Sequence, residues 1–372
     1  MFNYFYPSRF FYYAYASFFC GTLFDILNFS YNREFRYAFF VIAMIFLFLY
    51  LILTGKILKL GFLQSLILSF FLLVIFLSYD LFGFILVMFF LSCNQVDLNK
   101  IFFISFCILS LVSLFVILSC VCCSLFDDVV TARNTSYGVG TLRHSLGFKW
   151  SFCLPNIAVY LCVYYLVSRQ KINFFVLFIF QTISIILFKV CDSRNGLVSM
   201  ELLLLLVLLS KLCDSNFFIY FLKKISILMY SFVLSFAFLM FYLYLERYSV
   251  AIDIDSMLSG RLNLLSLNYL MSQPSFFSVM SYDDFVLNAP YTMDSGYYYL
   301  VFRYGWWLSL FFAFLCYKIA ICFIKVNNIL GSLSLIVILM MSFIDNNFAT
   351  YAFLPFYITG FFSLKHLQNL KC

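Results

Sequence analysis

Charged residues are scarce in this chain. Asp, Glu, Lys and Arg make up only 10% of its 372 residues, whereas soluble proteins carry roughly 25%. Hydrophobic residues make up 65%, and the mean hydropathy is +1.03. Many apolar runs approach the roughly 20 residues that cross a bilayer core, and no polar stretch is long enough to bury a core of its own. The composition therefore predicts an all-α polytopic membrane protein, with residues 1–372 forming a single integral membrane domain in the lipid bilayer.

Several well-known sequence motifs are also missing. The chain has no G-x-x-x-x-G-K-[ST] loop, no dinucleotide-binding fingerprint, no H-E-x-x-H pair and no G-x-S-x-G elbow. Its positive residues are spread over short loops without a basic run interleaved with aromatics, so we expect no nucleic-acid partner. Acidic pairs could ligate a divalent metal, but without EF-hand or His-rich spacing we expect no metal and no cofactor.

About twelve membrane segments follow from the apolar runs. The expected segments are 10–27, 37–53, 62–79, 81–92, 101–126, 150–167, 174–190, 197–210, 225–245, 297–317, 329–344 and 348–363. The short segment 81–92 is either a full span or half of a re-entrant pair with 62–79. With the N-terminus in the cytoplasm, two outer loops are long. These are 127–149 and the large loop 246–296, which lies between the ninth and tenth segments.

Lysine and arginine are distributed differently over the two sides of this topology. The lysines lie almost entirely in the inner loops, as the positive-inside rule requires. Nearly all the arginines lie in the outer loops: Arg33, Arg36, Arg133, Arg143, Arg194, Arg247 and Arg261. Arginine and lysine are equally effective in setting the orientation of a membrane protein. The guanidinium of arginine, however, can donate two parallel hydrogen bonds to a phosphate or carboxylate group, which an ammonium cannot. The arrangement predicts an anionic substrate on the outer face.

The first candidate cluster lies in residues 126–156. Beside several glycines, it contains the charged or titratable residues Asp127, Asp128, Arg133, Arg143, His144 and Lys149. A solvated loop whose charges serve only solubility is the alternative interpretation.

The second cluster surrounds Arg194, just before a helix expected to start near Gly196. Because a helix N-terminus presents amide groups and a partial positive charge, it suits a phosphate. Interfacial snorkelling by Arg194 is the alternative.

The third cluster is the large loop with Arg261, Asp294, Tyr297 and Arg303. Residues 259–272 within it show helical spacing of apolar residues. Arg303 lies two turns into the tenth segment, so it should face protein or a water-filled cavity. Tyr297 could stack on a sugar face or anchor at the membrane interface.

At these clusters the chain resembles the O-antigen polymerase (Wzy) family, whose relatives include the O-antigen ligases. RHSLGFKWSFCLPN (143–156) is similar to the family's Arg-x-x-x-Gly-Phe segment, and DSRNG (192–196) to its turn before a leucine-rich helix. SGR (259–261) and DSGYYYLVFRYG (294–305) resemble the two ends of its large periplasmic loop. The order and spacing match over residues 126–310.

The resemblance implies an enzyme of the bacterial inner membrane that joins undecaprenyl-diphosphate-linked oligosaccharide repeats on the periplasmic face. An acceptor hydroxyl would attack the donor's anomeric carbon, and undecaprenyl diphosphate would leave. Asp294 is the candidate for positioning or deprotonating that hydroxyl. Ligase-type relatives have a histidine near this place, which makes a ligase the weaker interpretation. With Asp294, the residues expected to be catalytic are Arg194 and Arg261, through contacts with the diphosphate leaving group. The residues expected to bind the substrate are Arg133, Arg143, His144, Arg303 and Tyr297.

Other functions stay open. A flippase for lipid-linked oligosaccharide, or another transporter, would also have about twelve helices, although transporters keep charged sites near the midplane and often show repeated halves. A ligase that transfers finished glycan and a membrane protein with a sensing loop are further alternatives. A chain-length regulator as a partner is also left open.

Overall fold

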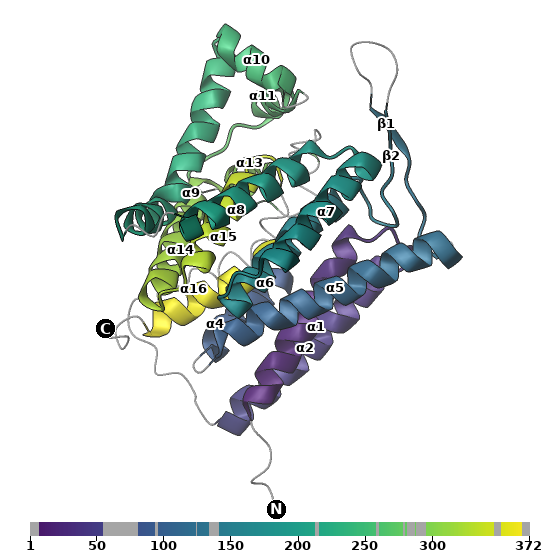
Figure 1. The fold of residues 1–372 in the computed structure, drawn as a ribbon, viewed down its shortest axis with the longest axis vertical. Coiled ribbons are helices and arrows are strands. Elements are labelled where there is room, and N and C mark those ends of the chain that lie inside the picture. Colours follow the sequence, from purple (N-terminus) through teal and green to yellow (C-terminus); the bar gives the residue numbers. More distant parts are fainter. Residues whose placement is uncertain are drawn as a thin grey trace, which may run out of the picture. The chain divides into compact units, whose positions relative to one another are not determined.

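A computed structural model describes residues 7–54, 81–93, 96–123, 125–133, 141–212, 216–257, 260–277, 280, 287, 295–345 and 351–366. The chain forms two compact units (Figure 1). The first unit contains the described residues of Met1–Ile57, Ser92–Ile219 and Asn327–Val337. The second contains those of Leu58–Leu91, Tyr220–Val326 and Ile338–Cys372.

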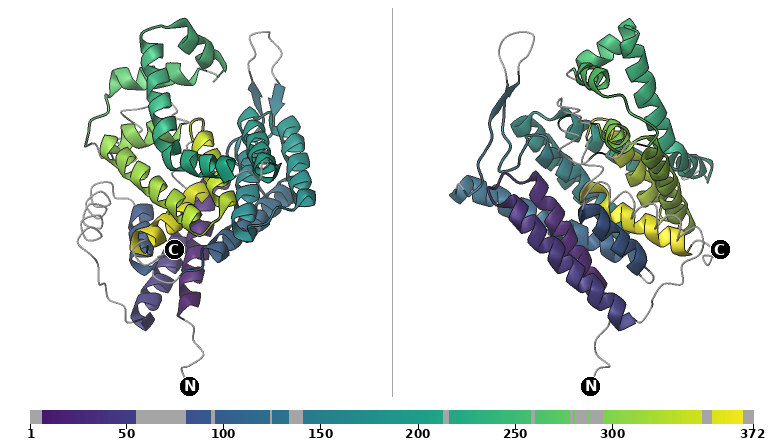
Figure 2. Two further views of the ribbon diagram at one scale, coloured as in Figure 1. Left: turned by 60° about the vertical axis from the view of Figure 1, so that its left-hand side comes forward. Right: turned by 180° about the vertical axis from the view of Figure 1, so that it is seen from behind.

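The elements of the first unit are helical apart from one short hairpin. They are α1 (Ser8–Leu23), η1 (Phe24–Ile26), α2 (Asn32–Thr54), α5 (Leu98–Cys123), β1 (Thr131–Arg133), β2 (Thr141–Arg143), α6 (Cys153–Arg169), α7 (Phe174–Cys191) and α8 (Arg194–Leu212). The two strands pair antiparallel, with Thr131 opposite Arg143. Figure 2 shows the hairpin at the end of this unit where α5 and α7 finish.

The second unit contains helices only among its described residues. They are α4 (Leu81–Ser92), most of α9 (Asn216–Leu245), α10 (Ser249–Met257), α11 (Arg261–Met271), α13 (Gly296–Tyr304), α14 (Trp306–Lys325), η3 (Tyr351–Phe353) and α16 (Leu354–His366). The border between the units passes through α9 and through α15 (Ile329–Met341).

Six of the described helices are long and apolar enough to cross a membrane. They are α2, α5, α7, α8, α9 and α14. Shorter apolar helices accompany them, among them α4, α6 and α15. The chain is therefore an all-α protein of the multi-pass membrane type, as its composition predicts.

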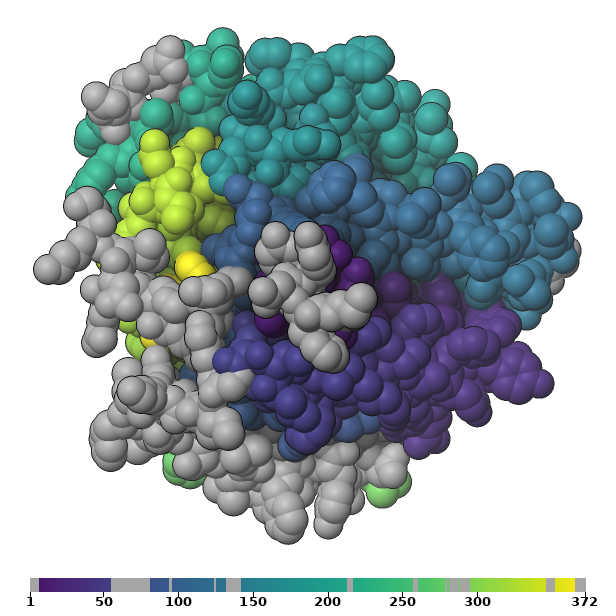
Figure 3. Space-filling model, turned by 90° about the horizontal axis from the view of Figure 1, so that it is seen from below, coloured from purple at the N-terminus to yellow at the C-terminus, as the bar shows by residue number. Residues whose placement is uncertain are grey.

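Helix α5 shows how a membrane helix divides its residues between two faces. Ser105, Ser113 and Ser119 are buried, whereas Leu111 and Phe115 are more than half exposed. Because lipid offers no hydrogen bonds, small polar groups belong at helix contacts and large apolar groups belong outside. Figure 3 views a face on which both α2 and α5 present side chains.

Close packing fixes α1 within the first unit. The Tyr15 hydroxyl and Ser105 Oγ are hydrogen-bonded across the α1–α5 contact at 2.5 Å. Gly21 lets α1 approach α2, because a Cβ at this position would lie 2.7 Å from Cδ1 of Phe40.

In the second unit, α11 packs back onto α9 and α13. Leu262 and Leu265 are buried in one cluster with Phe241, Tyr298 and Phe302. The helical spacing expected over 259–272 is thus present, with α11 spanning Arg261–Met271. Leu270, however, is 78% exposed, so only part of the expected apolar face is buried.

The segment expected over 297–317 is not one helix. It is divided between α13 and α14 at Gly305, which has φ 85° and ψ 170°. This backbone conformation is open to glycine and interrupts a helix. The expected segment 81–92 coincides with α4, while 62–79 lies outside the described residues.

Candidate functional site

The end of β2 contacts the turn between α7 and α8. Arg143 donates from Nε to Asp192 Oδ2 at 3.4 Å and from Nη2 to the Asp192 carbonyl at 3.1 Å. The His144 amide donates to the carbonyl of Val190 at 3.3 Å. Asp192 has left-handed backbone angles (φ 45°, ψ 43°) and ends α7. The first and second clusters of the sequence are therefore neighbours in space.

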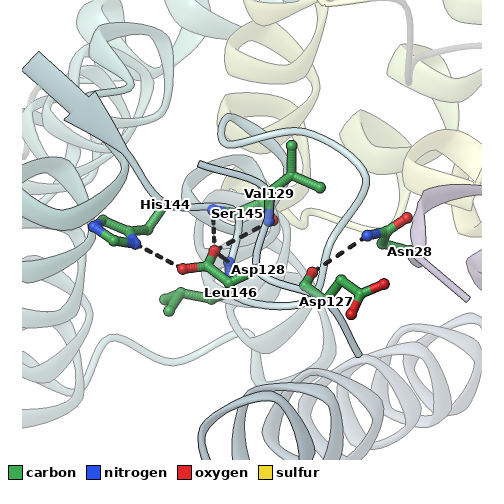
Figure 4. A network of polar contacts seen from close by, with 7 residues as sticks. All are labelled: Asn28, Asp127, Asp128, Val129, His144, Ser145 and Leu146. Carbon is green, nitrogen blue, oxygen red and sulfur yellow. Dashed lines mark hydrogen bonds and ion pairs between the residues drawn. The ribbon is translucent and has the colours of Figure 1, made fainter. Parts of the chain in front are cut away.

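Asp128 organises the loop around His144 (Figure 4). Its Oδ1 accepts from the amides of Ser145 at 2.8 Å and Leu146 at 2.9 Å. Its Oδ2 is 2.6 Å from His144 Nδ1. The Ser145 hydroxyl in turn accepts from the Val129 amide at 2.8 Å. The two carboxylate oxygens thus hold the backbone and the imidazole separately.

The electrostatics of this loop decide which atom carries the proton. Burial raises the pKa of the Asp128 carboxyl, but the hydrogen bonds from His144, Leu146 and Ser145 outweigh burial and leave that pKa below its ordinary value. The carboxylate is therefore ionised at neutral pH and can only accept hydrogen bonds. His144 Nδ1 is the donor in this pair.

The same loop is fastened to the connection between α1 and α2. The Asn28 amide donates to the Gly147 carbonyl at 3.1 Å, and the Lys149 amide donates to the Ile26 carbonyl at 2.8 Å. Gly147 has φ 86°, and a Cβ there would lie 2.9 Å from Val116 Cγ1. The tight turn therefore needs glycine. Three expected outer loops meet at this end of the unit.

The opposite end of the first unit joins segments expected on the inner side. The Asp97 amide donates to the Tyr12 hydroxyl at 3.1 Å, and Gln170 Nε2 donates to Asn99 Oδ1 at 2.9 Å. Segments that the sequence places on the inner side thus lie together at one end of this unit.

Arg194 is the first residue of α8, and its side chain is exposed. The start of this helix is pressed onto α6, because a Cβ on Gly196 would lie 2.6 Å from Pro155 Cβ and 2.8 Å from its carbonyl carbon. Arg194 therefore stands on a fixed helix end, two residues after the aspartate that holds Arg143.

In the second unit, Arg261 is the first residue of α11 and is half-buried. Its Nη1 donates to the Ile344 carbonyl at 3.1 Å. Asp255 Oδ1 accepts from the Leu262 amide at 2.7 Å, so a carboxylate already occupies the start of this helix. Gly260 precedes it with φ 78°.

Arg303 is buried, as its position two turns into an apolar segment predicts. It donates to the Tyr299 hydroxyl, and its guanidinium lies 4.9 Å from the ring centre of Tyr304. Tyr297 is 0% exposed and donates to the Leu339 carbonyl at 2.8 Å. A ring enclosed on all sides has no face for a sugar, so the stacking expected of Tyr297 does not fit this position.

Two expected site residues are described less fully. Arg133 lies at the end of β1, opposite Thr141 in the ladder. Asp294 lies outside the described residues.

The sequence interpretation assigned no role to two acidic residues and one aromatic residue of this region. Asp128 and Asp192 hold His144 and Arg143 across separations of 16 and 49 residues, which no local pattern reveals. Trp150 is 43% exposed and stacks on Phe152, with ring centres 5.7 Å apart and planes at 7°.

Within the described part of the chain, no group of three or more His, Cys, Asp or Glu side chains could hold a metal ion. Comparison with known proteins finds no matching family model, no matching curated protein and no matching solved structure.

Proposed function

We propose that this protein is a glycosyltransferase of the O-antigen polymerase type, acting on undecaprenyl-diphosphate-linked oligosaccharide at the periplasmic face of a bacterial inner membrane. The supporting observation is that Arg143 is hydrogen-bonded to Asp192 in the α7–α8 turn, two residues before the exposed Arg194. Two guanidinium groups at one end of apolar helices suit an anionic head group on a lipid tail.

The geometry of Arg143 supports a role toward a diphosphate. Asp192 accepts hydrogen bonds from Nε and Nη2 of Arg143, which form one edge of the planar guanidinium. The Nη1 donors lie on a different edge. The aspartate fixes the fork in place. Arg194 adds its charge at the N-terminus of α8, where the helix dipole also favours an anion.

In the proposed reaction, the hydroxyl of one lipid-linked repeat attacks the anomeric carbon of another. The new C–O bond forms as the bond to the diphosphate oxygen breaks, and undecaprenyl diphosphate departs with the bonding electron pair. A single displacement inverts the anomeric carbon. Charge accumulates on the leaving group in the transition state, so preorganised guanidinium groups lower the barrier at that point.

The test is a gel of surface lipopolysaccharide from a deletion strain complemented with variants. Arg194→Ala should shift the pattern from a ladder to a core with a single repeat, and Arg33→Ala is the matched control. Arg33 is also exposed and is the second residue of α2 in the first unit, but it has no place in the site.

The rival functions give different patterns. If the deletion strain makes lipopolysaccharide core without any repeat, the protein is a flippase or a ligase and not a polymerase. An unchanged ladder in the deletion strain would remove the protein from this reaction altogether. A normal ladder from Arg194→Ala beside a single-repeat deletion strain would keep the polymerase and discard the arginine's role.

A further inference from the structure

The His144–Asp128 pair has the arrangement of an oriented base. The carboxylate accepts from Nδ1 at 2.6 Å and is itself held by two backbone amides. The imidazole side chain is 41% exposed, and Figure 4 shows its second nitrogen pointing away from the carboxylate. In the neutral ring with its proton on Nδ1, Nε2 has the lone pair and can accept a proton.

The position of this imidazole matches the proposed reaction. His144 directly follows Arg143, and its own amide is bound to the last turn of α7, next to the turn that leads to Arg194. A proton acceptor and a diphosphate-binding fork are therefore supplied by adjacent residues of one strand end. The hydroxyl that attacks must lose a proton as its C–O bond forms, and the arginines cannot take it.

We infer that His144 is the general base of the glycosyl transfer, and that Asp128 is the positioning residue that holds Nε2 ready to accept. This inference rests on the proposed function. Nε2 takes the proton of the acceptor hydroxyl while the oxygen bonds to the anomeric carbon, and the electron pair of the broken bond leaves with the lipid diphosphate. The ring returns to its neutral form by releasing the proton to water.

The carboxylate geometry permits a sharp variant of Asp128. In Asp128→Asn, the remaining oxygen can still accept from the amides of Ser145 and Leu146, while the new NH₂ group faces His144 Nδ1. That group donates, so Nδ1 must become the acceptor and the ring proton moves to Nε2. The loop keeps its shape, but the base has the wrong tautomer, a change that can cost up to about 10⁴-fold in turnover.

The matching variant of the histidine is His144→Asn. Its side-chain NH₂ group can replace Nδ1–H as donor to Asp128, so the contact that holds the loop is retained, but no group remains to accept a proton. Two controls accompany it. His366→Asn changes the other of the two histidines, and Asn28→Ala removes a hydrogen bond to the Asp127 carbonyl of the same loop.

The experiment measures turnover and KM of the full chain, reconstituted in lipid nanodiscs with an undecaprenyl-diphosphate-linked repeat. His144→Asn and Asp128→Asn should each lower kcat by about 10²-fold or more, the scale of general base catalysis. KM should stay near that of the wild type in both variants, and the thermal unfolding temperature should stay near it in His144→Asn. In Asp128→Asn the unfolding temperature should fall only slightly, because the stabilising charge of the carboxylate is lost. All three quantities should stay near those of the wild type in both controls.

The outcomes separate this inference from the proposed function. Normal kcat in His144→Asn, with an active wild type, would overturn the base and leave the polymerase standing. A lowered unfolding temperature with unchanged kcat in Asp128→Asn would show a purely structural pair and would also overturn it. A wild type that makes no polymer under these conditions would overturn the proposed function, and the base with it.

Discussion

Two of the described helices, α8 and α11, begin with an arginine, and their N-terminal ends are built differently. At α8, Arg194 is exposed and the helix start is pressed against α6 at Gly196. At α11, Arg261 donates to the Ile344 carbonyl, and the carboxylate of Asp255 binds the amide of the next residue. The first end presents charge outward from a rigid support. At the second end, both the Arg261 guanidinium and the Leu262 amide are hydrogen-bonded within the protein itself.

The number of arginines in a segment does not define a binding site, because their surroundings differ. Arg303, the third arginine of interest, is enclosed by two tyrosines in the second unit. A buried guanidinium that contacts ring faces is held by cation–π attraction and contributes to packing. Among the described arginines, those at the α7–α8 turn are the better placed for a ligand.

The largest expected effect comes from replacing the first arginine of α8 or of α11 by lysine, which tests whether the two helix ends differ. Arg194→Ala should reduce polymerisation by about 10²-fold or more, and Arg194→Lys should restore little, because a diphosphate needs the fork. Arg261→Lys should retain most activity, since the bond to the Ile344 carbonyl needs only one donor. The measurement is the rate of chain elongation at equal protein levels. Equal rescue at both positions would remove the distinction between the two helix ends.

The second expected effect concerns the contact between α8 and α6 at Gly196. Gly196→Ala should destabilise the protein by about 1–3 kcal/mol, because the added Cβ would overlap the backbone of Pro155 and the tight contact cannot relax freely. Activity per folded molecule should also fall, since the start of α8 must move. Thermal unfolding in detergent, together with elongation rate, measures both. Unchanged stability would mean that α6 and α8 are less closely packed than the structure shows.

Much of the fold is predictable from the sequence, but the contacts within the site are not. Apolar runs locate α4 and α7 closely, because an apolar segment in lipid must satisfy its backbone groups internally and a helix does so. The break at Gly305 was missed because an isolated glycine in an apolar run is common. The pairing of Arg143 with Asp192 depends on how a loop folds back over 49 residues, which local spacing does not encode.

The third expected effect is smaller and concerns α11, whose start is capped by Asp255. Asp255→Ala should cost about 0.5–2 kcal/mol of stability, the scale for losing a side-chain acceptor at a helix start. Asp255→Asn should cost little, because an amide oxygen can accept from Leu262 equally well. Unfolding temperatures of the two variants provide the measurement. A large loss in Asp255→Asn would point to the charge of Asp255, and not to the hydrogen bond, as the source of its effect.

Gly260→Ala is the matched counterpart of Gly196→Ala. A Cβ at Gly260 meets nothing within 4 Å, so only its left-handed backbone (φ 78°) opposes the substitution. That strain costs roughly 1–2 kcal/mol, and activity per folded molecule should be unaffected. A loss of elongation rate in the folded protein would mean that the start of α11 takes part in the reaction, which would make the two helix ends alike.

The smallest expected effect is a dependence of stability on acid pH. Because the pKa of Asp128 is depressed in the folded protein, its contribution to stability is fully present above its unfolded pKa of about 3.9. That contribution is lost as the pH falls from there through the folded pKa, since the protonated carboxyl holds His144 and the backbone amides less well. Unfolding temperatures measured between neutral pH and pH 3 should therefore fall less steeply in Asp128→Asn than in the wild type. Equal slopes would mean that Asp128 contributes no more to stability as a carboxylate than as a neutral group. The difference between the exposed start of α8 and the bonded start of α11 would then rest on the arginines alone.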